Sequence, residues 1–118
     1  MTNIFILSIP HSSQRYNTCG DWMTESKNEL TVLVSECTDD SEFLVAIHEL
    51  VEAYLCKKAG ITQEMVDAFD LAYEGNEPGD NPYAPYHAQH KIAERVEKDL
   101  CFALGLTWEE HERIIDGL

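Results

Sequence analysis

A histidine and two glutamates fall within five consecutive residues of this chain. His48, Glu49 and Glu52 belong to the segment His-Glu-Leu-Val-Glu, which lies in a stretch with the apolar period of an α-helix. Residues four apart stack on one helix face, so the side chains of His48 and Glu52 leave the axis about 40° apart. An imidazole nitrogen and a carboxylate oxygen placed in this way can bind one cation. The spacing predicts a pair of metal ligands, with a simple hydrogen-bonded surface pair as the alternative.

The same five residues resemble the His-Glu-x-x-His helix of zincin metallopeptidases, with Glu52 in place of the second histidine. The resemblance implies that His48 is the first ligand of a zinc ion and that Glu49 is the general base of a hydrolase, most simply a peptidase. It also implies that the preceding strand, residues 30–36, is an edge strand that lies beside the helix and pairs with substrate. The resemblance covers this strand and helix.

A third ligand is expected on a later helix, from which gluzincins take a glutamate. In this chain that helix contains His87 and His90, and either would complete a set of two histidines and one carboxylate. Such a set suits zinc and leaves a position open for water. His90 lies at the margin of the apolar arc and His87 lies further round, so we favour His90 and keep His87 as its substitute. Because Glu52 is anionic, the preference of the site shifts somewhat towards Mn or Fe.

The whole chain also resembles a family of small, uncharacterised phage and prophage proteins. The similar segments are Pro10-His11, Gln14-Arg15-Tyr16, Gly20-Asp21-Trp22, residues 48–52, Pro78-Gly79-Asp80 and Tyr86-His87. This resemblance implies a phage origin and carries no established activity.

The helices that carry the candidate ligands are expected to follow a small sheet. Residues 3–9 and the alternating residues 30–36 are predicted strands, with a short strand at 21–24 between them, and we expect an antiparallel sheet over about residues 1–37. Capping residues, glycines and a proline place helices at about residues 41–59, 62–74, 85–104 and 107–116. We therefore expect one α+β domain over residues 1–118, in the form of a zincin-like minimal domain.

Two of these helices have an arc of large apolar residues that we expect to face the core. In the first helix the arc consists of Phe43, Leu44, Ile47, Leu50, Val51, Tyr54 and Leu55. In the third helix it consists of Ile92, Ala93, Val96, Leu100, Ala103 and Leu104. The candidate ligands lie at the margins of these arcs, so the predicted site is at the border between core and surface.

Charge and composition restrict the possible partners. The chain has 22 acidic and 8 basic residues, a formal net charge of −14. Binding to a phosphate backbone relies on clustered Lys and Arg, so we expect no nucleic acid partner. No apolar stretch approaches the roughly 18 residues of a membrane span, so we expect no membrane partner. A peptide or a host protein is the expected partner, with the oligomeric state open. The four cysteines are spread singly, which favours reduced thiols in the cytoplasm of a host cell.

Two other functions would use the acidic residues differently. Pairs of carboxylates three positions apart resemble the Mg-binding pairs of all-α nucleotide pyrophosphatases. These pairs are Glu49 with Glu52, Asp67 with Asp70, and Glu94 with Glu97. Alternatively, the chain is a non-enzymatic acidic phage protein that binds a basic surface of a host factor.

Four residues outside the predicted ligand set could also carry function. Arg15 could bind a substrate carboxylate, but we expect it to pair with a nearby acidic residue and to pin the first loop. The role of His11 in the same loop stays open. Cys101 is expected to be a small apolar filler, and His111 is expected to lie on the surface.

Overall fold

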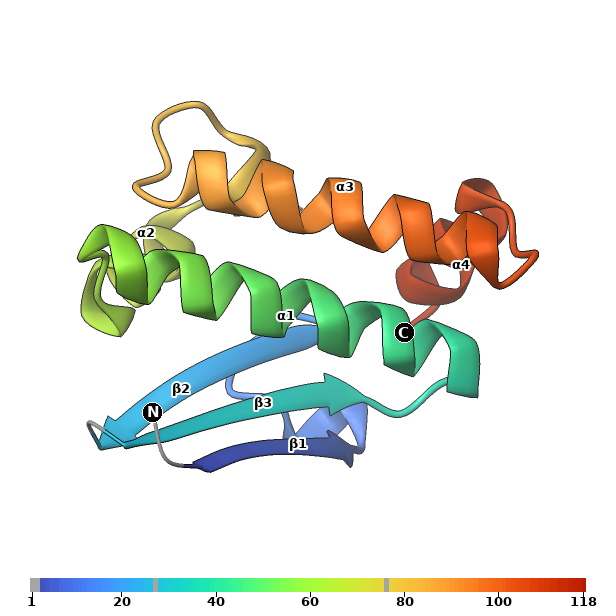
Figure 1. Cartoon of the computed structure of the whole chain (residues 1–118), viewed down its shortest axis with the longest axis horizontal. Coiled ribbons are helices and arrows are strands. Elements are labelled where there is room, and N and C mark those ends of the chain that lie inside the picture. The colour runs from blue at the N-terminus through green and yellow to red at the C-terminus, as the bar shows by residue number, and fades with distance from the viewer. Residues whose placement is uncertain (1–2, 27, 76) are drawn as a thin grey trace.

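The computed structural model describes residues 3–26, 28–75 and 77–118, and over these residues three strands precede four α-helices (Figure 1). The strands are β1 (Asn3–Ile9), β2 (Gly20–Ser26) and β3 (Glu29–Ser35). The α-helices are α1 (Asp39–Ala59), α2 (Gln63–Ala72), α3 (His87–Ala103) and α4 (Trp108–Asp116). Two short 3-10 helices are η1 (His11–Ser13) and η2 (Pro78–Asp80). The α+β arrangement is confirmed.

The sheet has the order β1-β3-β2 and is mixed, which corrects the expectation of a purely antiparallel sheet. β2 and β3 form an antiparallel pair, whereas β1 runs parallel to β3. The reason lies in residues 10–19, which cross the end of β3: the amide of Ser35 donates to the carbonyl of Cys19, and the amide of Glu36 donates to Ile9. The chain therefore reaches the far side of β3 before it reverses, and β3 returns between the other two strands.

The central position of β3 corrects a second expectation. Residues 30–36 were predicted to form an edge strand that pairs with substrate, but β3 is hydrogen-bonded to β1 on one side and to β2 on the other. Its backbone groups are used within the sheet and cannot receive a peptide. The edges of the sheet are β1 and β2.

The helices are stacked on one face of the sheet. α1 packs on β3 and β2, and α3 packs chiefly against the side of α1 that faces away from the sheet (Figure 1). α1 begins where the Thr38 side chain accepts a hydrogen bond from the amide of Ser41, and it ends at Gly60, whose φ of 75° is the left-handed conformation that glycine adopts most easily. No helix in the described ranges is both long and apolar enough to cross a membrane.

The faces that α1 and α3 turn inward differ from the predicted ones. Although Leu44 is buried as expected, Phe43 and Tyr54 are each 46% exposed, and Ile92 on α3 is 43% exposed. The buried residues of α1 are Ser41, Leu44, Val45, Ala46, His48, Glu52, Ala53 and Cys56. Those of α3 are His90, Ala93, Glu97 and Cys101. Apart from Leu44 and Val45, both helices thus bury small and polar side chains. Leu50 packs partly against the core, whereas Phe43, Tyr54 and Ile92 face the surface.

Candidate metal centre

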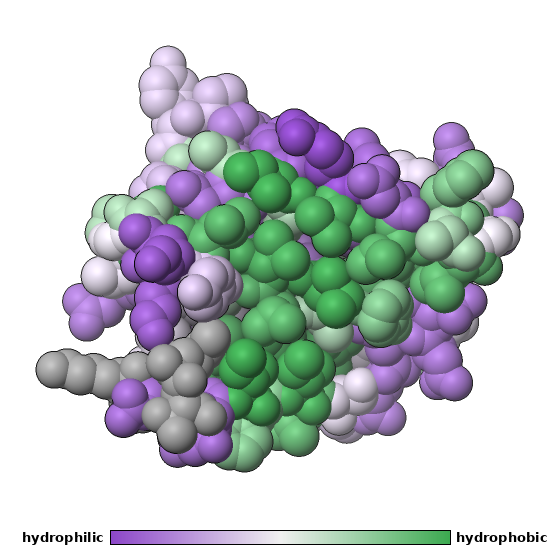
Figure 2. All heavy atoms as spheres, viewed as in Figure 1, coloured by the Kyte–Doolittle hydropathy of each residue, from purple (hydrophilic) through white to green (hydrophobic). Residues whose placement is uncertain are grey.

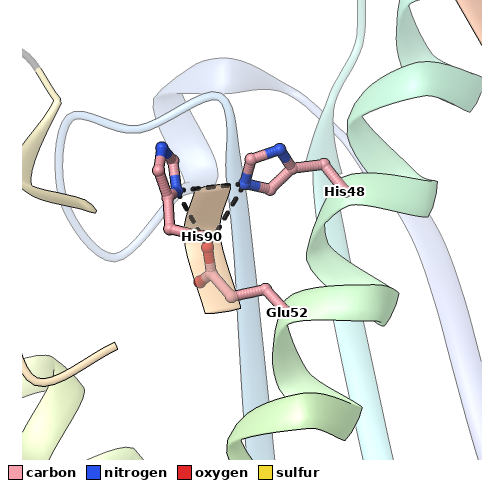
Figure 3. Close-up of side chains that lie close together, drawn as sticks. All are labelled: His48, Glu52 and His90. Carbon is pink, nitrogen blue, oxygen red and sulfur yellow. Dashed lines mark hydrogen bonds and ion pairs between the residues drawn. The ribbon is translucent and has the colours of Figure 1, made fainter. Parts of the chain in front are cut away.

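Three predicted ligands converge between α1 and α3. His48 and Glu52 project from successive turns of α1, and His90 projects towards them from α3 (Figure 3). The Nε2 atom of His48 lies 3.2 Å from the Nδ1 atom of His90 and 3.2 Å from the Oε2 atom of Glu52. The Nδ1 atom of His90 lies 3.0 Å from the same oxygen. All three residues are buried, so the structure contains a possible metal-binding cluster.

The separations of these three atoms match what a small divalent cation requires. Zinc binds imidazole nitrogen and carboxylate oxygen at about 2.0–2.1 Å, so two ligands of a tetrahedral site lie about 3.3 Å apart. Two neighbouring ligands of an octahedral site with bonds of similar length lie about 3.0 Å apart. The observed 3.0–3.2 Å falls between these values. A cation could therefore enter with shifts of a few tenths of an ångström.

The outer nitrogens of both histidines face carboxylates. His48 Nδ1 lies 2.7 Å from Glu97, and His90 Nε2 lies 3.2 Å from Asp80. An ionised carboxylate only accepts hydrogen bonds, so each outer nitrogen donates an N–H. In the neutral histidines, the inner nitrogens then carry lone pairs that point at one another and at Glu52. Three acceptors around one point call for a cation there, either a proton or a metal ion.

The second oxygen of Glu52 is also held. The indole N–H of Trp22, on β2, donates to Oε1 of Glu52 over 3.1 Å, while Oε2 faces the two histidines. Each of the three ligands is thus oriented by a partner from another element: Trp22 for Glu52, Glu97 for His48, and Asp80 for His90. Such outer contacts fix the orientation of metal ligands.

The carboxylate of Glu97 continues this network to α4. Its second oxygen accepts a hydrogen bond from His111 Nε2 over 2.6 Å, and His111 Nδ1 in turn lies 2.8 Å from the hydroxyl of Ser41. His111 is only 1% exposed, so the prediction that it lies on the surface is wrong. Its neighbours Glu109, Glu110 and Glu112 are exposed, and these acidic residues made the composition of the segment typical of a protein surface. The chain Ser41–His111–Glu97–His48 links the first turn of α1 to the cluster.

The charges of the cluster stabilise one another. Burial alone would lower the pKa of His48, but its hydrogen bonds with Glu52 and Glu97 raise that pKa well above 6.5. The pKa of His90 is raised by Glu52 against the same effect of burial. Burial would raise the pKa of Glu52, but the two histidines lower it to about 2. In the absence of a metal ion, the cluster therefore favours protonated imidazole beside ionised carboxylate.

Two glycines leave room for the site. A Cβ atom on Gly79 would lie 2.5 Å from ring atoms of His90, so η2 can lie against that ring only because this residue has no side chain. A Cβ atom on Gly20 would lie 2.8 Å from Cγ of Glu49 and 2.6 Å from Val45. The glycine at the start of β2 thus makes space for the glutamate that was predicted to be the general base.

Glu49 lies between two cavities that reach the cluster. The smaller, of about 140 Å³, is also lined by His48, His90, Glu97 and His111. The larger, of about 510 Å³, lies between β2, the first loop, α2 and the segment before η2, and Glu52 and His90 line it. Burial and the nearby charge of Glu52 raise the pKa of Glu49 well above its usual 4.5. This carboxyl group can therefore exchange a proton with a molecule in either cavity.

Several other predicted residues are engaged elsewhere. His87 Nδ1 donates a hydrogen bond to the carbonyl oxygen of Gly79 over 2.8 Å and does not join the cluster in which His90 takes part. Arg15 pairs with Asp21 over 2.7 Å and with Asp67 over 3.1 Å, so it pins the first loop as expected.

Asp70, from the predicted acidic pair of Asp67 and Asp70, is also engaged within the fold. Its carboxylate accepts hydrogen bonds from the hydroxyls of Tyr16 and Tyr86. Cys101 is buried, and its thiol donates to the carbonyl of Leu106, away from the cluster. His11 contacts the Ser35 hydroxyl over 2.8 Å, at the end of β3. All four cysteines are free.

A second group of potential ligands shares His90 with the first. This group consists of His90 with Glu77 and Asp80, which are both exposed, and the Nε2 atom of His90 lies 3.2 Å from Asp80. Asp80 also pairs with Lys91 over 2.8 Å, so its charge is already compensated. We therefore regard Asp80 as the residue that orients His90.

Sequence reasoning missed Trp22, Glu97 and Asp80 as residues that position the ligands. Trp22 and Asp80 lie in segments for which only a resemblance was expected, and Glu97 lies in a predicted acidic pair. Neither pattern indicates a hydrogen bond to a ligand. Comparisons with protein-family models, with curated proteins and with solved structures found no match.

Proposed function

We propose that this protein is a metal-dependent hydrolase, most simply a peptidase, in which His48, Glu52 and His90 hold a zinc ion. The observation that carries the proposal is the convergence of two imidazole nitrogens and one carboxylate oxygen within 3.0–3.2 Å of one another. Three protein ligands leave at least one coordination position for water, as in catalytic zinc sites. A purely structural zinc site has four protein ligands.

Zinc is our first choice of metal, with Mn and Fe as alternatives. Two histidines and one carboxylate also form the facial set of many iron sites, and the observed separations fit an octahedral face as well as a tetrahedral one. The anionic ligand Glu52 reduces the charge that the metal exerts on its water. A metal that tolerates higher coordination would be less affected by this reduction.

Glu49 is our candidate for the general base. It precedes the ligand Glu52 by three residues and lines both cavities that reach the cluster. A zinc ion held by His48, Glu52 and His90 would lower the pKa of a water to about 7, and Glu49 would be the carboxylate placed to take up its proton at neutral pH. In peptide hydrolysis the same carboxyl group would pass this proton to the leaving amine.

The larger cavity is the candidate substrate cleft. It has room for several side chains, and polar groups from the first loop, β2 and α2 dominate its walls. A peptide can use such walls for backbone hydrogen bonds. Its acidic residues include Asp21, Asp67, Asp70 and Glu77, of which Asp21 and Asp67 share the single positive charge of Arg15. We therefore expect neutral or basic peptides to bind better than acidic ones.

The proposal is tested first by metal content. Purified protein should retain about one transition-metal ion per chain in elemental analysis, and His48→Ala should lose it. His87→Ala is the matched control, because His87 lies three residues from His90 on the same helix and outside the cluster. Wild-type protein that stays metal-free after incubation with Zn, Mn or Fe would contradict the site.

Catalysis is tested separately by Glu49→Gln. This variant should bind metal as the wild type does but hydrolyse a mixed peptide library at least about 100-fold more slowly, the usual contribution of a general base. Equal rates for Glu49→Gln and wild type would remove Glu49 from the mechanism. Metal-loaded wild type without any peptide hydrolysis would leave a metal-binding protein and contradict the peptidase.

A further inference from the structure

One face of the molecule is apolar over three elements. Figure 2 shows apolar side chains gathered continuously over β1, α1 and α3, with polar side chains around the margin. We define this apolar face by its exposed and partly buried residues: Ile4, Ile6, Phe43, Ile47, Tyr54, Ile92, Val96 and Leu100. The five of these that rank as exposed are each between 43% and 47% accessible. It is separate from the metal cluster, which lies on the inward sides of the same two helices.

The strand at the lower margin of this face has an unprotected edge. Within the described ranges β1 is paired only with β3, through a continuous register without a bulge. It contains no charged residue and no proline, and Ile4, Phe5, Ile6 and Leu7 are each about half exposed. Natural proteins usually protect such an edge with charge, proline, a bulge or a cover, because it readily pairs with another strand. We infer that β1 and the apolar face form the interface of a homodimer.

A second copy of this chain fits the edge by symmetry. If two β1 strands pair antiparallel about a twofold axis perpendicular to the sheet, directly opposite residues point to the same side of the sheet. Centred on Phe5, the pairing places Ile4 opposite Ile6 of the second copy. Centred on Ile6, it places Phe5 opposite Leu7. In either register apolar side chains meet at the centre of the pairing, while Asn3 or Ser8 lies opposite an apolar residue towards its ends, and the two sheets join into one of six strands.

The helices supply the rest of this interface. Ile4 and Ile6 are in register with the buried Leu30 and Val32, so they lie on the α1 side of the sheet. α1 covers β3 and β2 and leaves β1 open, while the hydrogen bond from Ser8 to Glu42 brings the first turn of α1 beside the end of β1. Pairing of the strands would therefore bring the outward residues of α1, Phe43 first, towards those of the second copy.

The exposed area is sufficient for a dimer. Aromatic side chains bury roughly 150–250 Å² each and Ile and Leu side chains somewhat less, so the four exposed residues of β1 together with Phe43, Tyr54 and Ile92, each about half exposed, offer on the order of 500 Å². A standard interface buries about 800 Å² per partner, somewhat more than half of it apolar. The apolar contribution needed for a stable dimer is thus already on this surface.

The net charge distinguishes a second copy from a basic partner. Each chain carries −14, so repulsion opposes the dimer and salt screens that repulsion. Added sodium chloride should therefore strengthen association of two copies. A complex with a basic protein would weaken under the same treatment, because salt would screen an attraction.

Sedimentation velocity over micromolar concentrations tests the proposal. Wild type should reach twice its monomer mass of 13.4 kDa, and Ile6→Arg should raise the dimer dissociation constant more than about tenfold. Phe43→Arg, on the helix, should act in the same direction without altering the strand. Met65→Arg is the control, because Met65 is 45% exposed on α2, outside the apolar face, and Ile6 is 46% exposed.

Two results of these experiments would contradict the homodimer. Wild type that remains monomeric at high protein and salt concentration would overturn the dimer, whatever other partner covers this face. A dimer that survives both Ile6→Arg and Phe43→Arg, with circular dichroism showing folded protein, would place the interface elsewhere and overturn the proposal equally. If Ile6→Arg fails to fold, Phe43→Arg alone decides between these outcomes.

Discussion

The inward and outward faces of α1 and α3 reverse the usual distribution of side chains. Inward, these helices place two histidines and two glutamates between themselves, and each of these polar side chains has a partner. Outward, the same helices expose Phe43, Tyr54 and Ile92. Polar groups can thus occupy a buried layer when they satisfy one another, and apolar groups left outside then call for an external cover.

Substitutions at two adjacent residues of α1 test most directly how the inward and outward faces differ. Leu44→Arg should cost more than about 4 kcal/mol of unfolding free energy, because Leu44 is fully buried and the charge would have no partner. Phe43→Arg should change stability by less than about 1 kcal/mol, since the arginine stem can cover the same surface while its charge stays in water. Urea unfolding, at dilutions where the chain is monomeric, measures both. Similar losses in the two variants would show that the outward face is packed within the monomer.

A variant that removes the hydrogen-bond partner of the metal ligand His48 tests the inward face. Glu97→Gln should weaken metal binding by about 10–100-fold, because Glu97 orients His48 and accepts from His111 at the same time. Asp99→Asn, an exposed position on the same helix, should leave the affinity unchanged and serves as the control. Competition with a coloured chelator gives the affinities. An unchanged affinity in Glu97→Gln would mean that the carboxylate does not hold the histidine in its binding orientation.

Acid should weaken metal binding at the inward face. Glu52 and Glu97 raise the pKa of His48, and Glu52 raises that of His90, so protons compete with the metal for both inner nitrogens. Affinity should therefore fall by up to about tenfold per pH unit for each proton displaced, and the fall should begin above pH 6.5. Calorimetry in buffers of different ionisation enthalpy counts the displaced protons. Binding that releases no protons at neutral pH would contradict histidine ligands.

Much of the local structure followed from residues close together in the sequence. Thr38 and Gly60 mark the ends of α1, because a cap and a left-handed turn depend on the few residues around them. The pairing of His48 with Glu52 follows from the pitch of a helix, and so does the placement of His90 nearer to the site than His87.

Contacts between distant segments decided the rest. Trp22 reaches Glu52 across 30 positions, and His48 meets Glu97 across 49. Neither the helix period nor a short motif carries information on such pairs. The same is true of the central position of β3, which depends on the path of residues 10–19 across its end.

Local residue patterns are enough to place the helices and strands and to show which ligands share one helix face, since these features depend on local geometry. Which face of α1 and α3 turns inward depends instead on how the elements pack together. Burial of a polar side chain is favourable only when its hydrogen-bond partners arrive from other elements, and those partners, from β2, α3 and α4, are assembled by the fold.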